Sequence, residues 1–277
     1  MKKVILITGS TDGIGKLAAI KLAESQHEIY VHGRDPDKLT NVVNEIRGTT
    51  GNDLVDGFTA DFSDLKEVDR MAELIRHKLP RIDVLINNAG IYKSPQSTTK
   101  DGLDIRFTVN YFAPYILTQA LLPPLKKSEA PRIINLSSAA QTSVSLKALS
   151  GQRKISTSEA YAQSKLAILL WTFGMAKNYP DISMIALNPG SLLNTNMVRE
   201  AFGKSWASAD KGADIIYDLA VLKRYQNITG KYFDNDRGSI GQAHPDAYDA
   251  GIIDELLKKT SFILERILPE SNISYPG

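Results

Sequence analysis

The stretch VILITGSTDGIGK, residues 4–16, joins an apolar run to a loop that carries three glycines. The run from Val4 to Ile7 is typical of a buried strand, and helical apolar spacing begins at Gly15. Glycines at such a bend let backbone N–H groups approach a phosphate, and the helix N-terminus adds a partial positive charge. The spacing G-x-x-x-G-x-G therefore predicts a phosphate-binding loop rather than a purely structural turn. The residues of this loop are Gly9, Ser10, Asp12, Gly13, Ile14 and Gly15.

Beyond the loop, short apolar runs alternate with longer segments of helical periodicity. Predicted strands span residues 4–7, 28–31, 55–59, 84–86, 132–136, 183–187 and 231–233. Predicted helices span residues 15–25, 37–47, 66–78, 104–125, 161–178 and 210–222. Strands buried on both faces and separated by such helices form right-handed βαβ units. The pattern predicts an α/β fold, a single-domain doubly wound parallel sheet over residues 1–277 with helices on both faces.

Composition narrows the range of functions. The 277 residues carry a formal net charge of +2, which is too small to indicate a nucleic-acid partner. The apolar runs are shorter than the roughly 20 residues of a transmembrane helix. No cysteine is present, which excludes disulfides and thiol catalysis. The histidines have no acidic partners at metal-ligand spacing, so we interpret them as surface or capping residues and predict no metal site. Because the first predicted strand begins at Val4, we expect no leader peptide and a cytoplasmic location.

The end of the second predicted strand bears on the choice of dinucleotide. NAD-binding folds of this kind place an acidic residue there, about 20 residues after the glycines, to bind the ribose 2′-hydroxyl. Gly33 occupies that place and Arg34 follows it. A guanidinium can pair bidentately with a 2′-phosphate, so the sequence favours NADP(H). NAD(H) stays open, since Asp35 could turn inward to bind a 2′-hydroxyl while Arg34 faces solvent.

Small and polar residues follow four of the predicted strands. The glycine loop follows the first strand, Asn87–Gly90 the fourth, Ser138 the fifth and Asn188–Gly190 the sixth. Ligands bind outside the carboxyl ends of parallel strands, so these residues should lie on one edge of the sheet. Tyr161 and Lys165 are spaced to stack one turn apart on a helix, where the ammonium should lower the tyrosine pKa and make the phenol a general acid/base.

The chain resembles the short-chain dehydrogenase/reductase family over roughly residues 4–235. The motifs that carry the resemblance, all in the family's order, are Thr8-Gly9-x-x-x-Gly13-x-Gly15, Asn87-Asn88-Ala89-Gly90, Asn110, Ser138, Tyr161-x-x-x-Lys165 and Pro189-Gly190. The resemblance implies a Rossmann fold and a catalytic set of Ser138, Tyr161 and Lys165 supported by Asn110.

Roles of individual residues are implied by the same resemblance. Tyr161 would exchange a proton with the substrate oxygen, and Ser138 would hydrogen-bond that oxygen. Lys165 would lower the Tyr161 pKa and bind the nicotinamide ribose, and Asn110 would anchor a water relay to Lys165. Further cofactor contacts would come from Asp61 and Phe62 at the adenine, from Asn88, Ala89 and Gly90 at its ribose, and from Pro189, Gly190, Leu192 and Thr195 at the nicotinamide.

Two features depart from simple members of the family. Ser138 and Tyr161 have 22 residues between them, a longer separation that resembles the retinol-dehydrogenase-like and WW-domain oxidoreductase-like subgroup. The threonine usually found four positions beyond the glycine of Pro-Gly lies one residue further on, at Thr195, which leaves its nicotinamide contact open.

Two segments outside these motifs invite interpretation. Residues 191–209 are apolar but lack clear periodicity, and we expect a substrate lid with Leu192, Leu193, Met197, Phe202 and Trp206, the alternative being a helix packed on the core. Residues 252–268 show an apolar stripe that predicts an amphipathic C-terminal helix. That helix should pack on the domain or on a second subunit of a homodimer. Peripheral membrane contact stays open, although the helix lacks a basic polar face.

These observations predict an NADP(H)-dependent oxidoreductase that moves hydride between nicotinamide and a carbonyl or alcohol. The subgroup resemblance and the apolar lid favour a hydrophobic aldehyde or ketone, retinoid- or steroid-like. The alternative is a non-catalytic NADP-binding regulatory or scaffold protein on the same fold. The complete set of Asn110, Ser138, Tyr161 and Lys165 argues against that alternative.

Overall fold

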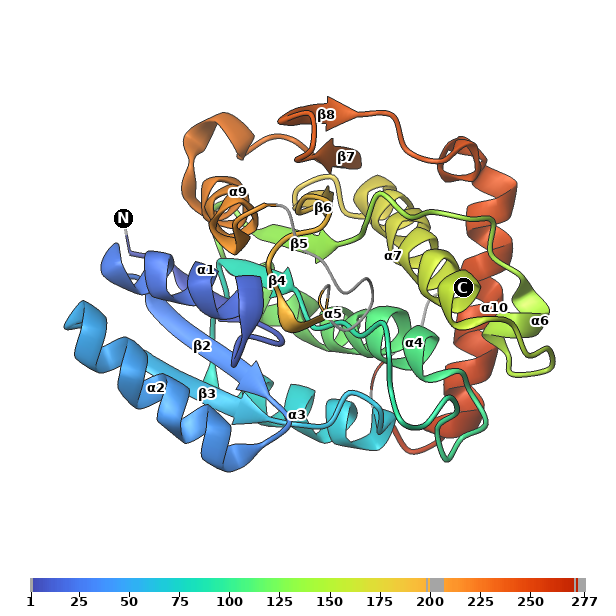
Figure 1. Ribbon diagram of the computed structural model, residues 1–277, viewed down its shortest axis with the longest axis horizontal. Coiled ribbons are helices and arrows are strands. Elements are labelled where there is room, and N and C mark those ends of the chain that lie inside the picture. Colours follow the sequence, from blue (N-terminus) through green and yellow to red (C-terminus); the bar gives the residue numbers. More distant parts are fainter. Residues whose placement is uncertain (1, 198, 200–206, 272, 274–277) are drawn as a thin grey trace.

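The computed structural model describes residues 2–197, 199, 207–271 and 273. Eight strands of the described chain form one sheet, in the order β3-β2-β1-β4-β5-β6-β7-β8 (Figure 1). They are β1 (Val4–Ile7), β2 (Glu28–Gly33), β3 (Val55–Thr59), β4 (Val84–Asn87), β5 (Arg132–Leu136), β6 (Ser183–Asn188), β7 (Lys231–Asp234) and β8 (Ser239–Gly241). All neighbours pair in parallel except β7 and β8, which are antiparallel. The order runs outward in both directions from β1 and β4, which confirms the predicted doubly wound sheet.

Helices cover both faces of the sheet. The helical segments are α1 (Gly13–Glu24), α2 (Pro36–Thr50), α3 (Leu65–Lys78), α4 (Ile105–Phe107), η1 (Thr108–Phe112), α5 (Ala113–Leu125), α6 (Leu146–Leu149), α7 (Thr157–Asn178), α9 (Ala209–Val221), η2 (Lys223–Tyr225), η3 (Pro245–Tyr248) and α10 (Ala250–Ile267). The hydrophobic core has two layers, one on each face of the sheet. The first layer lies between the sheet and α1, α2 and α9, and the second between the sheet and α3, α5 and α7, with α10 packed on α7 (Figure 1). In β1, Ile5 and Ile7 face the first layer and Leu6 the second, which explains why this strand is apolar at every position.

The helix that carries Tyr161 and Lys165 begins at a capping box. The Glu159 N–H donates to Ser156 Oγ at 3.2 Å, and the Ser156 N–H donates to Glu159 Oε2 at 3.0 Å. Because this reciprocal pair satisfies the free N–H groups of the first turn, α7 begins at Thr157, earlier than the predicted start at residue 161. Tyr161 therefore lies one turn inside a well-anchored helix.

Three further elements differ from the prediction. The helix predicted over 104–125 is divided by the π-helical turn η1. Nearly every residue of this segment is buried, so the apolar pattern does not reveal the extra residue of the turn. The segment 139–160, which lacks clear periodicity, contains α6 and the start of α7. The short strand β8 was missed because its residues are exposed or only partly buried and show no apolar alternation.

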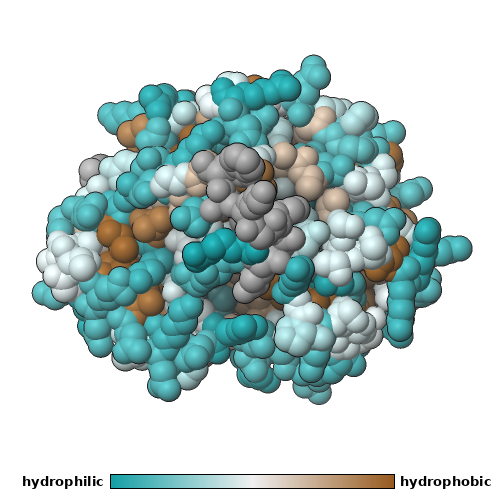
Figure 2. All heavy atoms as spheres, viewed as in Figure 1, coloured by the Kyte–Doolittle hydropathy of each residue, from teal (hydrophilic) through white to brown (hydrophobic). Residues whose placement is uncertain are grey.

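The surface offers few large apolar groups. The face drawn in Figure 2 is mainly hydrophilic, with small separate hydrophobic patches. Exposed large apolar side chains among the described residues are scattered, at Leu54, Leu74, Ile240, Tyr248 and Phe262. Within the described part of the chain, the helices are too short or too polar to cross a membrane.

Candidate active site

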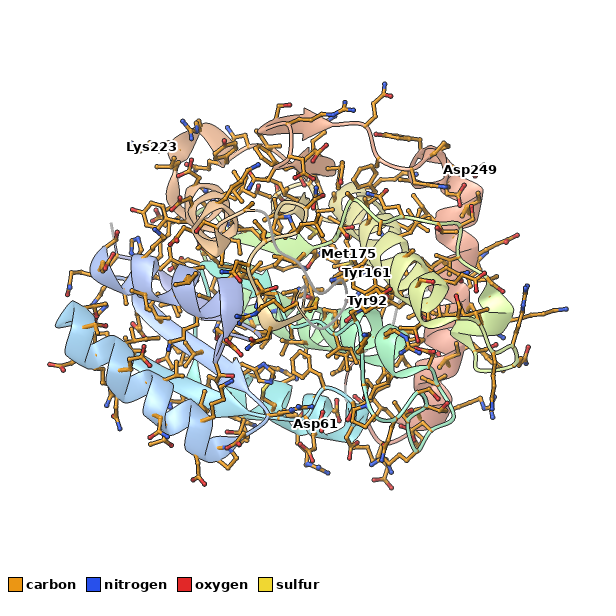
Figure 3. The ribbon with its side chains drawn as sticks, in the orientation of Figure 1. Asp61, Tyr92, Tyr161, Met175, Lys223 and Asp249 are labelled. Atoms are coloured by element: carbon orange, nitrogen blue, oxygen red, sulfur yellow. The ribbon has the colours of Figure 1, made fainter. Side chains whose placement is uncertain are left out.

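The structure brings the four predicted catalytic residues together at the carboxyl edge of the sheet. Ser138 lies just beyond β5, Tyr161 and Lys165 lie one turn apart on α7, and Asn110 lies in the π-turn η1. The Ser138 side chain hydrogen-bonds the Tyr161 phenol. The Lys165 Nζ lies 5.7 Å from the centroid of the Tyr161 ring. Figure 3 shows Tyr161 near the centre of the molecule, beside Tyr92.

Lys165 is an ammonium held inside the protein. Its side chain is 4% exposed, and its Nζ donates to the carbonyl oxygen of Leu136, the last residue of β5, at 2.9 Å. Burial disfavours the charged form and lowers the pKa of Lys165 to about 8. The lysine is therefore fixed between the end of a strand and the Tyr161 ring.

The pKa of Tyr161 differs from the value expected from the sequence. Burial of the phenol raises its pKa above the ordinary value, the Ser138 hydrogen bond lowers it, and the neighbouring Tyr92 raises it further. Desolvation thus outweighs the favourable groups in the protein alone, because the Lys165 ammonium is itself buried and directed at the Leu136 carbonyl. Tyr161 is consequently protonated at neutral pH, which is the state needed to donate a proton.

Asn110 joins α7 to the loop after β4. Its Nδ2 donates to Ser164 Oγ at 2.9 Å and to the Ile91 carbonyl at 3.1 Å, and its Oδ1 accepts the Ile91 N–H at 2.8 Å. A Cβ built on Gly90 would lie 3.3 Å from both Asn110 Oδ1 and Lys165 Nζ. The loop after β4, the π-turn and α7 therefore meet at one point.

The glycine loop is packed against the end of β4. Gly9 has a φ of +61°, and a Cβ there would lie 2.6 Å from Ala89 Cα. The Asn88 Nδ2 donates to the carbonyls of Thr8 and Gly9, each at 2.8 Å. The Asn88 amide thus supports the loop from behind, and the first N–H groups of α1, at Ile14 and Gly15, are those that a helix leaves for an anion.

Arg34 and Asp35, on which the predicted cofactor preference rests, lie in different environments. Asp35 is the N-cap of α2, and its Oδ1 accepts the N–H groups of Asp37 and Lys38, each at 3.0 Å. Arg34 is exposed, and its guanidinium forms no ion pair within the described part of the chain. The carboxylate is therefore used in capping, whereas the guanidinium is free to meet an anion.

The residues predicted at the adenine follow β3. Asp61 Oδ1 accepts the Ser63 N–H at 2.9 Å, and the Asp61 N–H donates to Glu67 Oε2 at 2.8 Å. The ring of Phe62 is 4% exposed and stacks on the ring of His32, with centroids 4.2 Å apart. Contact of Asp61 and Phe62 with an adenine ring stays a prediction.

The turn after β6 faces the glycine loop. A Cβ on Gly13 would lie 3.7 Å from Thr195 Cγ2, and Asn196 Nδ2 donates to Asp12 Oδ2 at 2.7 Å. In the same turn, Gly190 has a φ of +122° and Leu192 a φ of +52°. Phe202 and Trp206, predicted for the lid, lie outside the described residues. The segment from Pro189 to Thr195 is thus brought over the predicted phosphate site.

Sequence reasoning missed several residues that shape the site. Tyr92 packs its ring edge-on against Tyr161, with centroids 5.0 Å apart. Asp236 accepts the N–H of Ser191 at 2.8 Å and so holds the turn after β6, and Asn235 Nδ2 donates to the Pro189 carbonyl at 2.8 Å. The polar run 234–236 follows β7, so the strand-end rule that selected Ser138 could also have found it.

His32 was interpreted from the sequence as a surface or capping residue, and this was wrong. Its side chain is 3% exposed, at the carboxyl end of β2. Its ring contacts Phe62, Ala60 and Gly9, which lie in the loops after β3 and β1, so the groups that bury it are distant in the sequence.

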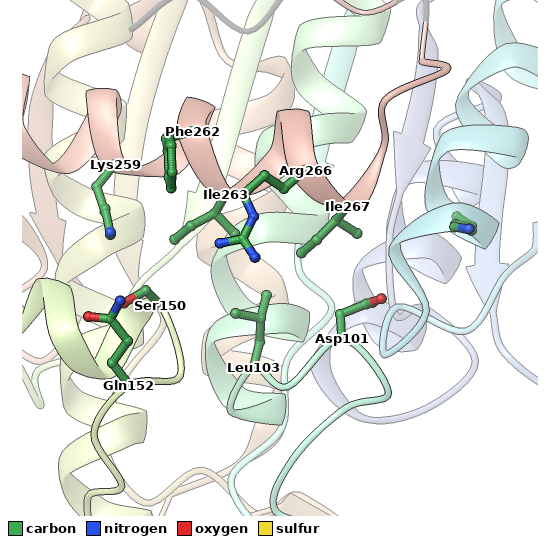
Figure 4. A pocket seen from close by; sticks show the side chains of 10 residues that line it. Asp101, Leu103, Ser150, Gln152, Lys259, Phe262, Ile263, Arg266 and Ile267 are labelled. Atoms are coloured by element: carbon green, nitrogen blue, oxygen red, sulfur yellow. The ribbon is translucent and has the colours of Figure 1, made fainter.

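A pocket of about 380 Å³ lies elsewhere, between α10 and the loops around Asp101 and Ser150 (Figure 4). Lys259, Phe262 and Arg266 of α10 line it. None of its lining residues belongs to the set at the carboxyl edge of the sheet, so it is separate from the candidate active site.

Comparison with known proteins agrees with this geometry. The family model described as short chain dehydrogenase matches residues 3–205. Retinol dehydrogenase 13 of Homo sapiens is 35% identical over 84% of this chain and 76% of its own length. A protein of Streptomyces sp. (strain C5), provisionally named daunorubicin C-13 ketoreductase DnrU, is 34% identical over 92% of this chain and 90% of its own length.

Solved structures show the same fold. A Mycobacterium paratuberculosis protein is 26% identical, with a TM-score of 0.77 over 99% of this chain and 95% of that chain. A short-chain dehydrogenase of Escherichia coli CFT073, so classed provisionally and solved with NADPH, is 27% identical, with a TM-score of 0.70 over 84% of this chain and 96% of that chain.

The fold, the site and these matches define an NAD(P)-dependent oxidoreductase that acts on CH–OH and C=O groups. The chain belongs to the short-chain dehydrogenase/reductase family and resembles its retinol dehydrogenases.

Proposed function

We propose that this protein is an NADP(H)-dependent reductase/dehydrogenase of a hydrophobic aldehyde or ketone, with Tyr161 as the general acid/base. The observation that carries the proposal is the assembly of Ser138, Tyr161 and Lys165 around the end of β5. A phenol, a hydroxyl and an ammonium at the carboxyl edge of a doubly wound sheet match the needs of carbonyl reduction.

Preference for NADP(H) over NAD(H) rests on the end of β2. The glycine loop leaves no room for a side chain at Gly9. At the end of β2, where NAD-binding folds carry an acidic residue, this chain has Gly33. Asp35 is used as a helix cap, while Arg34 is exposed and suited to a 2′-phosphate. The Escherichia coli protein solved with NADPH, and one from Shigella flexneri solved with NADP at 29% identity, support this choice.

The residues of the site divide the reaction among them. A bound nicotinamide supplies hydride to the carbonyl carbon, or accepts it in oxidation. Tyr161 gives its phenol proton to the carbonyl oxygen and takes it back in the reverse direction. Ser138 donates a hydrogen bond to the same oxygen as negative charge develops there. The Lys165 ammonium, 5.7 Å from the ring centroid, stabilises the phenolate that remains.

The substrate is proposed to be hydrophobic, retinoid- or steroid-like. Tyr92 places an aromatic ring beside the reacting phenol, and Leu192 lies in the turn that faces the glycine loop. The names of the relatives, which refer to retinol and to the C-13 ketone of daunorubicin, are consistent with a bulky apolar substrate. A substrate lid over 191–209, a cytoplasmic location and a homodimer belong to the same proposal. Cell fractionation tests the location, and light scattering tests the dimer.

Substitution of Arg34 by Ala tests the cofactor assignment. Loss of a charge-assisted pair with the 2′-phosphate should raise the Kd of NADPH about tenfold to a hundredfold and leave the Kd of NADH unchanged. Quenching of Trp fluorescence on titration gives both constants. Equal NADPH affinity of the wild type and the Arg34→Ala variant would refute the role of Arg34.

Activity itself is tested by following NADPH oxidation across a panel of aldehydes, ketones and quinones. Retinoid and steroid carbonyls should be turned over faster than short polar aldehydes. A preference for short polar aldehydes would contradict the proposed substrate class while leaving the reaction type intact.

A further inference from the structure

The His32 ring connects two loops of the proposed dinucleotide site, the glycine loop after β1 and the loop after β3. Its Nδ1 lies 3.0 Å from the N–H nitrogen of Gly9, in the phosphate-binding loop. Its Nε2 lies 3.1 Å from the carbonyl oxygen of Ala60, immediately before Asp61. Gly9 offers a proton there and Ala60 offers only an acceptor, so both contacts require one state of the ring: neutral, with the proton on Nε2.

The backbone of His32 binds the same loop. The Ser10 N–H donates to the His32 carbonyl at 2.9 Å, and the His32 N–H donates to Ser10 Oγ at 3.0 Å. The Ser10 hydroxyl in turn donates to the Ile7 carbonyl at 2.7 Å. Three hydrogen bonds, one from the ring and two from the backbone, therefore join one residue of β2 to the first two residues of the glycine loop.

The other side of the ring is also fixed. Phe62 stacks on it with centroids 4.2 Å apart and an interplanar angle of 29°. Ala60 and Phe62 flank Asp61, the residue predicted at the adenine. The imidazole thus spans the space between the loop after β1 and the loop after β3, and a shift of either loop would break one of its hydrogen bonds.

We propose that His32 is a positioning residue of the cofactor site, which sets the distance between the phosphate-binding loop and the adenine side through its Nε2–H tautomer. The inference rests on the proposed dinucleotide function of the two loops. An intact bridge holds both loops in place before the dinucleotide binds. Binding then does not carry the entropy cost of ordering these loops. Burial, which lowers the pKa of His32 to about 4, keeps the ring neutral at physiological pH.

Two isosteric substitutions separate the two ring contacts. In His32→Asn the side-chain oxygen can take the place of Nδ1 and accept from Gly9, whereas in His32→Gln the amide nitrogen can take the place of Nε2 and donate to Ala60. A third variant, His32→Phe, keeps an aromatic ring against Phe62 but has neither hydrogen bond. Because the bridge needs both contacts, each variant should bind NADPH more weakly than the wild type. His32→Phe, which lacks both hydrogen bonds, should have the lowest affinity.

His27 supplies a matched control. It precedes the opposite end of β2, is 9% exposed, and accepts the Lys3 N–H through its own Nδ1 at 3.3 Å. His27→Gln therefore removes a buried imidazole with a similar contact, far from the glycine loop. It should lower the melting temperature without changing NADPH affinity.

The experiment measures the Kd of NADPH and of its fragment 2′,5′-ADP by calorimetry, with the melting temperature of each cofactor-free variant. We expect Kd to rise about threefold to tenfold in the Asn and Gln variants and more in the Phe variant, with kcat at saturating NADPH within twofold of wild type. NADPH affinity equal to wild type in folded Gln and Phe variants would overturn the inference. Wild-type protein that binds neither NADPH nor NADH would instead overturn the cofactor site itself.

The ring state is tested on the wild type alone, which covers the case in which the variants do not fold. Nitrogen chemical shifts of the labelled imidazole should show the Nε2–H tautomer of His32 at pH 7. An Nδ1–H tautomer or a charged ring would contradict the two hydrogen bonds and overturn the proposal.

Discussion

At the scale of single residues, the site combines groups that are costly to bury. Lys165 is 4% exposed and has a pKa near 8, below its value of 10.5 in the unfolded chain. Between these two values the unfolded state holds a proton that the folded state has lost, so the stability of the cofactor-free protein rises with pH through this window. Below pH 8 the buried ammonium lowers stability by its full amount.

The first prediction concerns replacement of this ammonium by an apolar group. Lys165→Met should stabilise the cofactor-free protein at pH 7 by about 2 kcal/mol, after allowance for the lost bond to the Leu136 carbonyl, and raise its Tm by a few degrees. The difference should shrink as the pH approaches 10.5. Thermal melts at pH 7 and pH 10 measure it. A variant less stable than wild type at pH 7 would show that the ammonium is not destabilising, while its activity should be lost in either case.

At the scale of elements, α10 is attached to α7 by close packing. Gly174 of α7 leaves no room for a side chain, since a Cβ there would lie 2.9 Å from Ile253 Cγ2 and 3.2 Å from Leu257 Cδ1. Deeper in the same layer, the Tyr111 hydroxyl and Thr260 Oγ1 lie 2.7 Å apart. These contacts hold α10 against the outer side of α7.

The second prediction compares two helical glycines. Gly174→Val should cost about 1–3 kcal/mol of stability, because the added methyl groups overpack the contact with Ile253. Gly48→Val is the control: Gly48 is exposed on α2, and a Cβ at this position would have no neighbour within 4 Å, so its variant should stay within about 0.5 kcal/mol of wild type. Urea unfolding of both variants provides the comparison. Equal stability of the two variants would contradict the prediction and show that α10 shifts to accommodate the added side chain.

Most strands and helices could be predicted from the sequence, because a buried parallel strand appears as an apolar run and an amphipathic helix as apolar residues at helical spacing. The β1–loop–α1 unit and the strands β3 and β5 begin and end where the pattern placed them, within two residues. The π-turn at Asn110 was not recoverable, since nearly every residue from 105 to 125 is buried and no one-sided apolar stripe exists that an extra residue could displace. The start of α7 was recoverable in principle from Ser156 and Glu159, which the apolar pattern alone ignores.

The site was predictable only where it consists of strand ends and a helical spacing. Ser138, Tyr161 and Lys165 meet as the motifs predicted, and the glycine loop lies beside the end of β4. Tyr92 and Asp236 act through contacts between distant segments, and His32 through burial, and none of these properties is local in sequence. The pKa of Tyr161 likewise depends on desolvation, which the Tyr-x-x-x-Lys spacing does not reveal.

At the scale of the whole molecule, one edge of the sheet carries both halves of the proposed reaction. The glycine loop and His32 lie at the ends of β1 and β2, where the adenosine half of the cofactor is proposed to bind. Ser138, Tyr161 and Lys165 lie beyond β4, around the end of β5. Binding of the adenosine half and proton transfer therefore depend on different strands and should be separable by mutation.

The measurement that tests this account most directly is a comparison of wild type and Tyr161→Phe. Both proteins are titrated with NADPH, and the single-turnover rate of NADPH oxidation is then measured with the best carbonyl substrate of the panel. The account predicts an NADPH Kd within about threefold of wild type and a rate lower by about 10²–10⁴-fold, the contribution of a general acid. A Tyr161→Phe variant that oxidises NADPH within tenfold of the wild-type rate would contradict it.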